Sequence, residues 1–255
     1  MSRAVITAPG TEPEPGSGDP SGGWRVSRRT AALVAASACA TVFAVAAVRL
    51  SAELTRGPTP AERAAAAAAE PAGRYRTWPA GRIFPAEIPY TLGQSAPETA
   101  RRVGIGTDTR CETAADDALV RSLTSRGCRA VLRATYLDQA QGLAVTVGVV
   151  VFPDERSARE AVAWFPDGEP RPGLRALPFA DSVAARFGDA ARQTSAAAQR
   201  GPYVVAATAG YADGRPALRG AQADLAELAP QLVRGVLRPL ATPATVRCGE
   251  REWRC

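Results

Sequence analysis

The stretch RAVLRATYLDQAQGLAVTVGVVVF, residues 129–152, decides the fold because it holds two strand patterns separated by a short polar turn. From Arg129 to Leu137 apolar and polar residues alternate, which predicts a strand with one buried face. From Leu143 to Phe152 almost every residue is apolar, which predicts a central strand covered on both faces. Asp138–Gly142 supplies the turn, so we expect an antiparallel hairpin. The core face of the first strand should carry Ala130, Leu132, Ala134 and Tyr136.

A helix is expected on each side of this hairpin. Thr113–Arg126 is the first, and Gly127 follows it as a C-terminal stop. Its apolar face consists of Ala115, Leu119 and Leu123. After the hairpin, Asp154 caps a second helix, which Pro166 closes. The apolar residues of that helix recur with helical spacing, at Ala158, Ala161, Val162 and Phe165.

The C-terminal half predicts a second hairpin and a long final helix. Residues 166–178 are rich in proline and glycine and should form a surface loop. Strands are expected near residues 190–198 and 202–211, although the Ala-rich first strand is equally compatible with a helix. The final helix should cover residues 219–237 with a kink at Pro230. Its buried row should be Leu225, Leu228, Leu232 and Val236.

These elements predict an α+β fold in which two β-hairpins form an antiparallel sheet with packed helices. The expected order is helix, hairpin, helix, hairpin, helix, after an N-terminal transmembrane helix. Two such units could come from an internal duplication. Tyr136-Leu137-Asp138 and Tyr211-Ala212-Asp213 fall at loosely similar places but differ in register, so duplication stays a hypothesis.

The uncharged segment Thr30–Val48 predicts a membrane helix directly after the basic cluster Arg25-Val-Ser-Arg-Arg29. Its length of 19 residues corresponds to roughly 28 Å of helix, close to the hydrocarbon thickness of a bilayer. Three arginines precede the segment and only Arg49 directly follows it, so the positive-inside rule places the N-terminus in the cytoplasm. We therefore expect a single-pass protein of the cell membrane with its C-terminal part outside the cytoplasm.

Other readings of this segment export the same domain. Ala44-Val-Ala46 fits the small-x-small site of a cleaved signal peptide, which would give a secreted protein. Ser27-Arg28-Arg29 is similar to the start of a twin-arginine signal. Cys39 would be the acylated residue of a lipoprotein, although apolar residues continue beyond it.

The chain thus divides into a disordered cytoplasmic tail, a transmembrane helix, a stalk and an extracytoplasmic α+β domain, at residues 1–29, 30–48, 49–80 and 81–255. The tail holds almost nothing apolar to bury, which is typical of disorder. In the stalk, Thr59 and Glu62 fit a capping box before a short Ala-rich helix, which Pro71 should end.

The composition excludes several catalytic classes. The chain has no histidine, lysine or asparagine, and its 31 basic residues are all arginine. Without histidine there is no Ser-His-Asp triad, Cys-His pair or imidazole metal site. Without lysine there is no Schiff base and no P-loop lysine. We expect no cofactor, no metal and no catalytic residue of these kinds, which leaves carboxylates, hydroxyls, arginines and thiols.

The net charge of +6 is spread along the chain, and no block of arginines is dense enough to indicate binding to nucleic acid. The simplest reading is a solvated, arginine-rich surface. A weak attraction to anionic envelope polymers or lipid headgroups is the alternative.

Four of the five cysteines fall in the exported part, where disulfides persist. Their spacing favours Cys111–Cys128 and Cys248–Cys255, and the alternative joins a tail cysteine to Cys111 or Cys128. The first bridge would close a loop of about 16 residues, worth roughly 3 kcal/mol in the chain-entropy model. A redox site is the competing use of these thiols.

No short motif specifies an active site. Gly104-Ile-Gly106 is too short for a dinucleotide fingerprint, so we expect a turn there. Asp116 and Asp117 fall in the first two turns of a helix, where carboxylates favour the helix dipole. An acid–base pair like that of a glycosidase would have to come from Asp138, Asp154, Asp167, Glu169 and Asp181.

The aromatic residues are the remaining candidates, because they could line a groove for a sugar or a lipid. Trp164 and Tyr203 fit the core better than a groove. Trp78 near the stalk and Trp253 near the C-terminus are better candidates for contact with a partner. The other two candidates are Tyr90 and Tyr211.

The layout of leader, anchor, Ala- and Pro-rich stalk and disulfide-stapled domain resembles the single-pass or exported proteins common in actinomycetes. The resemblance rests on layout and composition, so it carries no functional residue. We expect a non-enzymatic envelope protein that binds a wall polymer, a lipid or another membrane protein through its external domain. The alternatives are an extracytoplasmic hydrolase with a carboxylate pair, and a membrane sensor component.

Overall fold

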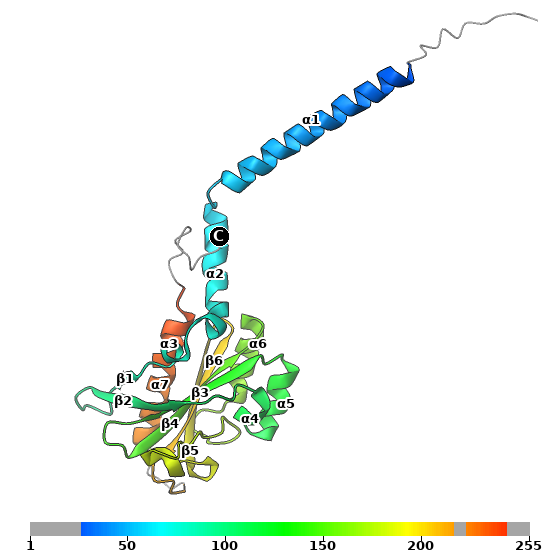
Figure 1. Cartoon of the computed structure of the whole chain (residues 1–255). Coiled ribbons are helices and arrows are strands. Elements are labelled where there is room, and N and C mark those ends of the chain that lie inside the picture. Colours follow the sequence, from blue (N-terminus) through cyan, green and yellow to red (C-terminus); the bar gives the residue numbers. More distant parts are fainter. Residues whose placement is uncertain (1–26, 217–222, 244–255) are drawn as a thin grey trace, which may run out of the picture. The chain divides into compact units, whose positions relative to one another are not determined.

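The computed structural model describes residues 27–216 and 223–243 (Figure 1). The chain divides into two compact units, Met1–Gly57 and Pro58–Cys255. In the first unit, Ser27 caps helix α1 (Arg28–Thr55), and its side chain accepts a hydrogen bond from the Arg29 amide. By length and composition, α1 can cross a membrane. It extends beyond Val48, the last residue of the uncharged segment, to Thr55.

In the second unit, six strands of the described residues form one antiparallel sheet in the order β1-β2-β3-β4-β6-β5. Strand β4 lies at its centre, and eight of its nine residues are buried, as its apolar sequence predicted. Both expected hairpins are present, β3–β4 and β5–β6. In chain order the strands are β1 (Glu87–Tyr90), β2 (Glu98–Ile105), β3 (Ala130–Leu137), β4 (Leu143–Val151), β5 (Arg192–Arg200) and β6 (Tyr203–Tyr211).

The expected order of elements is wrong at its start, because β1 and β2 precede the first helix that we expected after the stalk. These two strands pair with each other, and β2 also pairs with β3. The sheet therefore contains a third antiparallel pair at the β1 edge, and β5 forms the other edge.

Helices cover both faces of the sheet (Figure 1). One hydrophobic cluster packs α3 and α7 against the face that carries Ala134 and Tyr136 of β3. A second cluster packs α4, α5 and α6 against the opposite face. These helices are α3 (Ala80–Ile83), α4 (Cys111–Ala114), α5 (Asp117–Ser125), α6 (Glu155–Ala161) and α7 (Ala223–Ala241). Three short 3-10 turns lie between α6 and β5 among the described residues, η1 (Val162–Trp164), η2 (Val183–Arg186) and η3 (Asp189–Ala191).

The helix expected at Thr113–Arg126 is divided into α4 and α5. The division occurs at Ala115, which is extended and forms an isolated β-bridge with Leu174. The apolar face predicted for this helix is buried, and Gly127 ends α5 with a φ of +75°. Asp154 caps the N-terminus of α6 as expected, because its side chain accepts a hydrogen bond from the Ser157 amide.

The segment between α6 and β5 does not simply lie on the surface, because Leu174 is buried. Its backbone is held on the sheet by polar side chains. The Thr135 hydroxyl donates to the carbonyl of Leu177 at 2.7 Å, and the Leu177 amide donates to the Thr146 hydroxyl at 3.0 Å. Arg192 donates to the carbonyl of Leu174 at 2.7 Å.

The final helix has the buried row that its spacing predicted, Leu225, Leu228, Leu232 and Val236. It extends to Ala241, beyond the expected end, with Pro230 and Pro239 inside it. The start expected at residue 219 lies outside the described residues.

Helix α2 (Pro60–Thr77) begins with the expected capping box of Thr59 and Glu62. We expected Pro71 to end this helix, but Pro71 lies inside it. The C-terminal half of α2 docks on the domain, which compensates for the hydrogen bond that proline cannot donate. The Tyr203 hydroxyl donates to the Pro71 carbonyl and accepts from the Tyr75 amide at 3.4 Å. The domain therefore includes this half of the expected stalk.

Candidate functional site

A cleft of about 600 Å³ lies over the β1–β2–β3 end of the sheet. Its volume is within the range of small-molecule binding sites. Strands β1 and β2 and the turn after β3 form it. The lining residues are Glu87, Thr99, Arg101, Arg102, Val103, Leu137, Asp138, Gln139 and Gln141.

The strand register brings the charged lining residues together. Glu87 of β1 faces Arg101 of β2, and Arg101 faces Leu137 of β3. Residues directly opposite one another in neighbouring strands share a face of the sheet, so these three side chains form a row across it. The neighbouring residue Ala100 points to the opposite face and belongs to the first core cluster.

The turn between β3 and β4 forms a rigid rim of the cleft. Asp138 Oδ1 accepts a hydrogen bond from the Leu143 amide at 2.7 Å, and the Gln141 amide donates to the Asp138 carbonyl at 3.1 Å. Gln141 has a φ of +58°, in the left-handed region that non-glycine residues seldom adopt. The fixed turn therefore holds the Gln141 side chain at the rim despite the backbone strain.

Tyr90 connects the same turn to strand β1. Its hydroxyl donates to the Glu98 carboxylate and accepts from the Gln139 amide at 3.1 Å. Burial and the hydrogen bond to Glu98 raise the pKa of Tyr90 to about 12, so the phenol stays protonated. The Gln139 side chain also accepts from the Thr99 amide at 3.3 Å, which joins the rim to β2.

The charged groups of the cleft differ in how accessible they are to a ligand. The Arg102 guanidinium donates to the Phe84 carbonyl, and Asp138 is buried in the turn. The pair formed by Arg101 and Glu87 is open, because their side chains are 76% and 59% exposed and their nearest charged atoms are 3.7 Å apart. This pair is therefore the part of the cleft that is best able to exchange partners.

No protein-family model matches this chain, and no curated protein or solved structure matches it either. The function has to follow from the chemistry of the chain's own residues. Among the described residues, histidine, cysteine, aspartate and glutamate form no group of three that could hold a metal ion.

Of the five carboxylates proposed for an acid–base pair, only Asp138 lines the cleft. Asp154 caps α6, and Asp167 accepts from the Ala197 amide at 3.3 Å. Glu169 and Asp181 occupy exposed positions between α6 and β5. The second carboxylate of the cleft is Glu87, which our sequence analysis missed because it lies in an unrecognised strand.

Asp116 and Asp117 hold the irregular segment before β5 in place. Asp116 forms a two-pronged ion pair with Arg192, at 2.8 and 3.0 Å, and accepts from the Gly173 amide. Burial alone would raise the pKa of Asp116, but the bonds from Arg192 and Gly173 lower it on balance. Asp117 is exposed and pairs with Arg175 at 2.8 Å.

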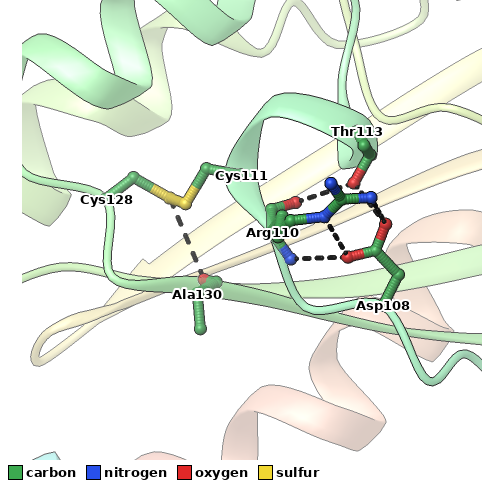
Figure 2. The surroundings of a disulfide bond; sticks show 6 residues. All are labelled: Asp108, Arg110, Cys111, Thr113, Cys128 and Ala130. Carbon is green, nitrogen blue, oxygen red and sulfur yellow. Dashed lines mark hydrogen bonds and ion pairs between the residues drawn. A yellow bond between two sulfur atoms is a disulfide. The ribbon is translucent and has the colours of Figure 1, made fainter.

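The disulfide expected between Cys111 and Cys128 is present, with an S–S distance of 2.04 Å (Figure 2). It joins the first residue of α4 to Cys128, which lies two residues before the start of β3. Because both thiols are used, the alternative pairing of a tail cysteine with either of them is wrong. Cys248 and Cys255 lie outside the described residues, and Cys39 is a free, exposed thiol in α1.

Asp108 organises the loop in front of this disulfide (Figure 2). Its carboxylate accepts from the Arg110 guanidinium at 2.9 and 3.0 Å and from the Thr113 hydroxyl at 2.7 Å. These hydrogen bonds, with that of Arg110 the strongest, hold the pKa of Asp108 far below its usual range. The loop is thus fixed by an ion pair on one side and by the disulfide on the other.

The turn expected at Gly104-Ile-Gly106 is wrong, because Gly104 and Ile105 belong to β2. Gly104 serves close packing instead: a Cβ atom there would lie 2.3 Å from the Phe179 ring. The register of β2 also shifts between Arg102 and Gly104, which bends the strand beside the cleft.

The aromatic candidates do not gather in one groove. Tyr90 and Tyr203 are buried. Trp164 is half-buried against the second core cluster. Trp78 lies between two arginines, with the Arg74 and Arg82 guanidinium carbons 4.6 and 3.8 Å from its ring centroid. The ring of Tyr211 is covered by Arg215, and Trp253 lies outside the described residues.

A second hollow of about 410 Å³ lies between β5 and α7. Alanines of β5 and Ala226, Pro230 and Val233 of α7 line much of it, with Asp167 and Arg234 also at its surface. It offers fewer fixed polar groups than the cleft at β1–β3. The cleft is therefore the better candidate for specific recognition.

Proposed function

We propose that the protein is a non-enzymatic, envelope-associated binding module whose cleft at β1–β3 takes a polar ligand outside the cytoplasm. In this proposal α1 is the single membrane anchor and the N-terminus is cytoplasmic. Release as a secreted protein after cleavage at Ala44-Val-Ala46 is the alternative, and it leaves the same domain outside.

The observation that carries this proposal is the construction of the cleft. The backbone that carries its polar groups belongs to two paired strands and a hydrogen-bonded turn, so these positions are held before a ligand arrives. Preorganised groups lose little conformational freedom on binding, which favours affinity. The Tyr90 hydroxyl and the Asp138 carboxylate support the rim directly, through the Gln139 and Leu143 amides.

The proposed location is supported by two independent features. The basic cluster before α1 favours a cytoplasmic N-terminus. The Cys111–Cys128 disulfide fits a compartment outside the cytoplasm, where thiols become oxidised.

Binding to envelope components tests the proposal. The compact unit of residues 58–255 would be titrated by calorimetry with soluble peptidoglycan fragments and wall glycans, and sedimented with anionic phospholipid vesicles. A Thr99→Trp variant would fill the cleft, whereas Thr107→Trp would add the same side chain at an exposed position outside it. We expect binding that Thr99→Trp abolishes and Thr107→Trp leaves unchanged. If no component binds, or if both variants bind like the wild type, the proposal fails.

A carboxylate-dependent hydrolase is the second candidate, because Glu87 and Asp138 line the same cleft. It predicts release of reducing ends or peptides from wall polymers by the wild-type unit. Glu87→Gln and Asp138→Asn would each remove that activity while preserving side-chain shape. Wild-type protein that binds a polymer without cleaving it would favour the binding module.

A membrane sensor component is a third candidate, supported by the firm attachment of α2 to α7 through Arg74. It predicts that deleting residues 1–23 changes a cellular response to an external stimulus. An unchanged response would remove this candidate.

A further inference from the structure

The open charge pair of the cleft indicates what kind of ligand fits there. We infer that the cleft binds a zwitterionic amino-acid group, in which an ammonium and a carboxylate are attached to the same carbon. The inference rests on the proposed binding function and narrows it to one ligand class. Glu87 would receive the ammonium and Arg101 the carboxylate.

The first argument is that the Glu87–Arg101 pair is easily opened. The two residues face each other across β1 and β2, and their nearest charged atoms are 3.7 Å apart with both side chains well exposed. Exposed pairs of this kind contribute little to stability. A ligand whose own charges lie alongside the pair, and so satisfy both partners, therefore displaces only a weak interaction.

The second argument is geometric. In an α-amino acid, standard bond lengths place the ammonium nitrogen about 3 Å from the nearer carboxylate oxygen. This separation is similar to that between the Glu87 carboxylate and the Arg101 guanidinium, so one small group could contact both side chains. A guanidinium binds a carboxylate through two parallel hydrogen bonds, which would fix the orientation of the ligand.

The third argument is the balance of charge around the pair. The described lining residues include two arginines and two acidic residues, so a polyanion would meet Glu87 and Asp138 as repulsive neighbours. Among residues 27–216 and 223–243, no aromatic side chain lines the cleft to stack on a sugar ring. A zwitterion avoids both difficulties.

The rest of the lining suits the remaining parts of such a ligand. The Thr99 hydroxyl and the side-chain amide groups of Gln139 and Gln141 offer hydrogen bonds at the rim. Val103 and Leu137 offer an apolar surface for a short aliphatic side chain, because Val103 packs against a small hydrophobic cluster that contains Leu137, Ala144 and Phe187. The cleft therefore has complementary groups for the charged end and for a small side chain.

Calorimetry with matched ligands tests this inference on residues 58–255 and on the full chain in detergent. The probes are D- and L-alanine, N-acetylalanine and alaninamide, of which the last two each lack one of the charges. We expect at least one alanine to bind, and each blocked form to bind at least tenfold more weakly. A muramyl peptide ending in diaminopimelate carries the same group on a polymer fragment, so it distinguishes an envelope polymer from a free amino acid.

Matched variants locate the binding. Glu87→Gln and Arg101→Gln should each weaken binding at least tenfold. Glu155→Gln removes one partner of an exposed pair with Arg159 on α6 and should leave binding unchanged. Unchanged melting temperatures would show that the variants remain folded.

The possible failures are distinguishable. If the blocked forms bind as well as alanine, or if the Glu87 and Arg101 variants bind normally, the zwitterion inference is wrong. If only inorganic phosphate or chitooligosaccharides bind, and Thr99→Trp prevents this, the inference is wrong while the proposed binding function stands. If no probe of any class binds, both fail.

Discussion

The guanidinium of Arg74, a residue of α2, lies against the last turn of α7, and its Nη1 atom is 2.9 Å from the carbonyl oxygen of Leu240. The same nitrogen donates to the carbonyls of Pro239 and Thr242, at 2.8 and 2.7 Å, and Glu70 provides the counter-charge. Only 2% of Arg74 is exposed. The side chain therefore caps the C-terminus of α7 and attaches α2 to the domain.

Replacing Arg74 with alanine should lower the free energy of unfolding by about 3 kcal/mol, because buried carbonyl groups lose their donor and Glu70 loses its partner. Urea unfolding of residues 58–255 measures the change. Arg63→Ala is the matched control, because Arg63 is an exposed arginine of the same helix and should change stability by less than about 0.5 kcal/mol. Equal losses in the two variants would show that α2 is not attached in this way.

Replacing either of two buried arginines with methionine should change the free energy of unfolding by very different amounts. Arg192→Met should cost about 3–5 kcal/mol, because it leaves the partly buried Asp116 without its ion pair. Arg133 donates to the Arg175 carbonyl at 3.3 Å, and its Nε has no hydrogen-bond partner among the described residues. Burial lowers the pKa of Arg133, which reflects the cost of its charge there. Arg133→Met should therefore be neutral or stabilising in the same unfolding experiment, and a loss as large as that of Arg192→Met would contradict this account.

Acid should weaken the contact between Asp116 and Arg192. The pKa of Asp116 is lower in the folded protein than its ordinary value, so the ion pair stabilises the fold at pH values above about 4, the ordinary pKa of aspartate. This contribution is lost as the pH falls through the folded-state pKa. Between pH 6 and pH 2, the melting temperature of Asp116→Asn should fall less than that of the wild type. Parallel curves for the two proteins would mean that Asp116 titrates equally in the folded and unfolded chain.

The centre of the fold could be predicted from sequence because its signals are local. Continuous apolar sequence specified β4, and helical spacing specified the buried row of α7. Alternation located β3, but the single buried face that we expected is wrong: Ala130 and Leu132 are half-buried, and the opposite face is also covered, by the helices and the segment before β5. These patterns reflect burial of whole faces, which is the dominant contribution to folding. Capping by Thr59 and Asp154 was equally local and was confirmed.

The sheet edge at β1 and β2 could not be predicted because long-range contacts form it. Strand β1 has four residues, one of them Pro89, and the register shift near Gly104 interrupts alternation in β2. Their partners are distant in sequence: β2 pairs with β3, and a Cβ atom at Gly235 of α7 would lie 2.6 Å from Ile88. The division between α4 and α5 has a similar cause, the bridge from Ala115 to Leu174.

The candidate cleft was missed for the same reason, since its lining comes from three separate segments. Asp138 was recognised as a carboxylate of interest, but its neighbour Glu87 lies 51 positions earlier, in a strand that we did not expect. Only the strand register places the row from Glu87 to Leu137 on one face.

Two glycine-to-alanine changes should have opposite effects on stability. A Cβ atom at Gly210 of β6 would lie 2.1 Å from the Ala191 carbonyl oxygen, a backbone atom that cannot easily move. Gly210→Ala should therefore cost about 1–3 kcal/mol. At Gly73, inside α2, a Cβ atom would meet no heavy atom within 4 Å, so Gly73→Ala should stabilise the helix by about 0.5–1 kcal/mol. Melting temperatures that move in the same direction would contradict the packing at one of these sites.

The disulfide of the folded domain determines which partners remain for the two C-terminal cysteines. Cys111 and Cys128 are joined to each other, so we expect Cys248 and Cys255 to pair with one another. Non-reducing proteolysis with mass spectrometry of the protein, purified from membranes with free thiols blocked, should give one Cys111–Cys128 peptide pair and one Cys248–Cys255 peptide.

A Cys111→Ser/Cys128→Ser variant should lose about 3 kcal/mol of stability in the chain-entropy model. A Cys248→Ser/Cys255→Ser variant serves as its control and should leave the Cys111–Cys128 pair intact. Blocked thiols at Cys248 and Cys255, or a bridge from either to a second molecule, would contradict the intramolecular pairing. Blocked thiols at Cys111 and Cys128 as well would also remove the disulfide support for the proposed extracytoplasmic domain.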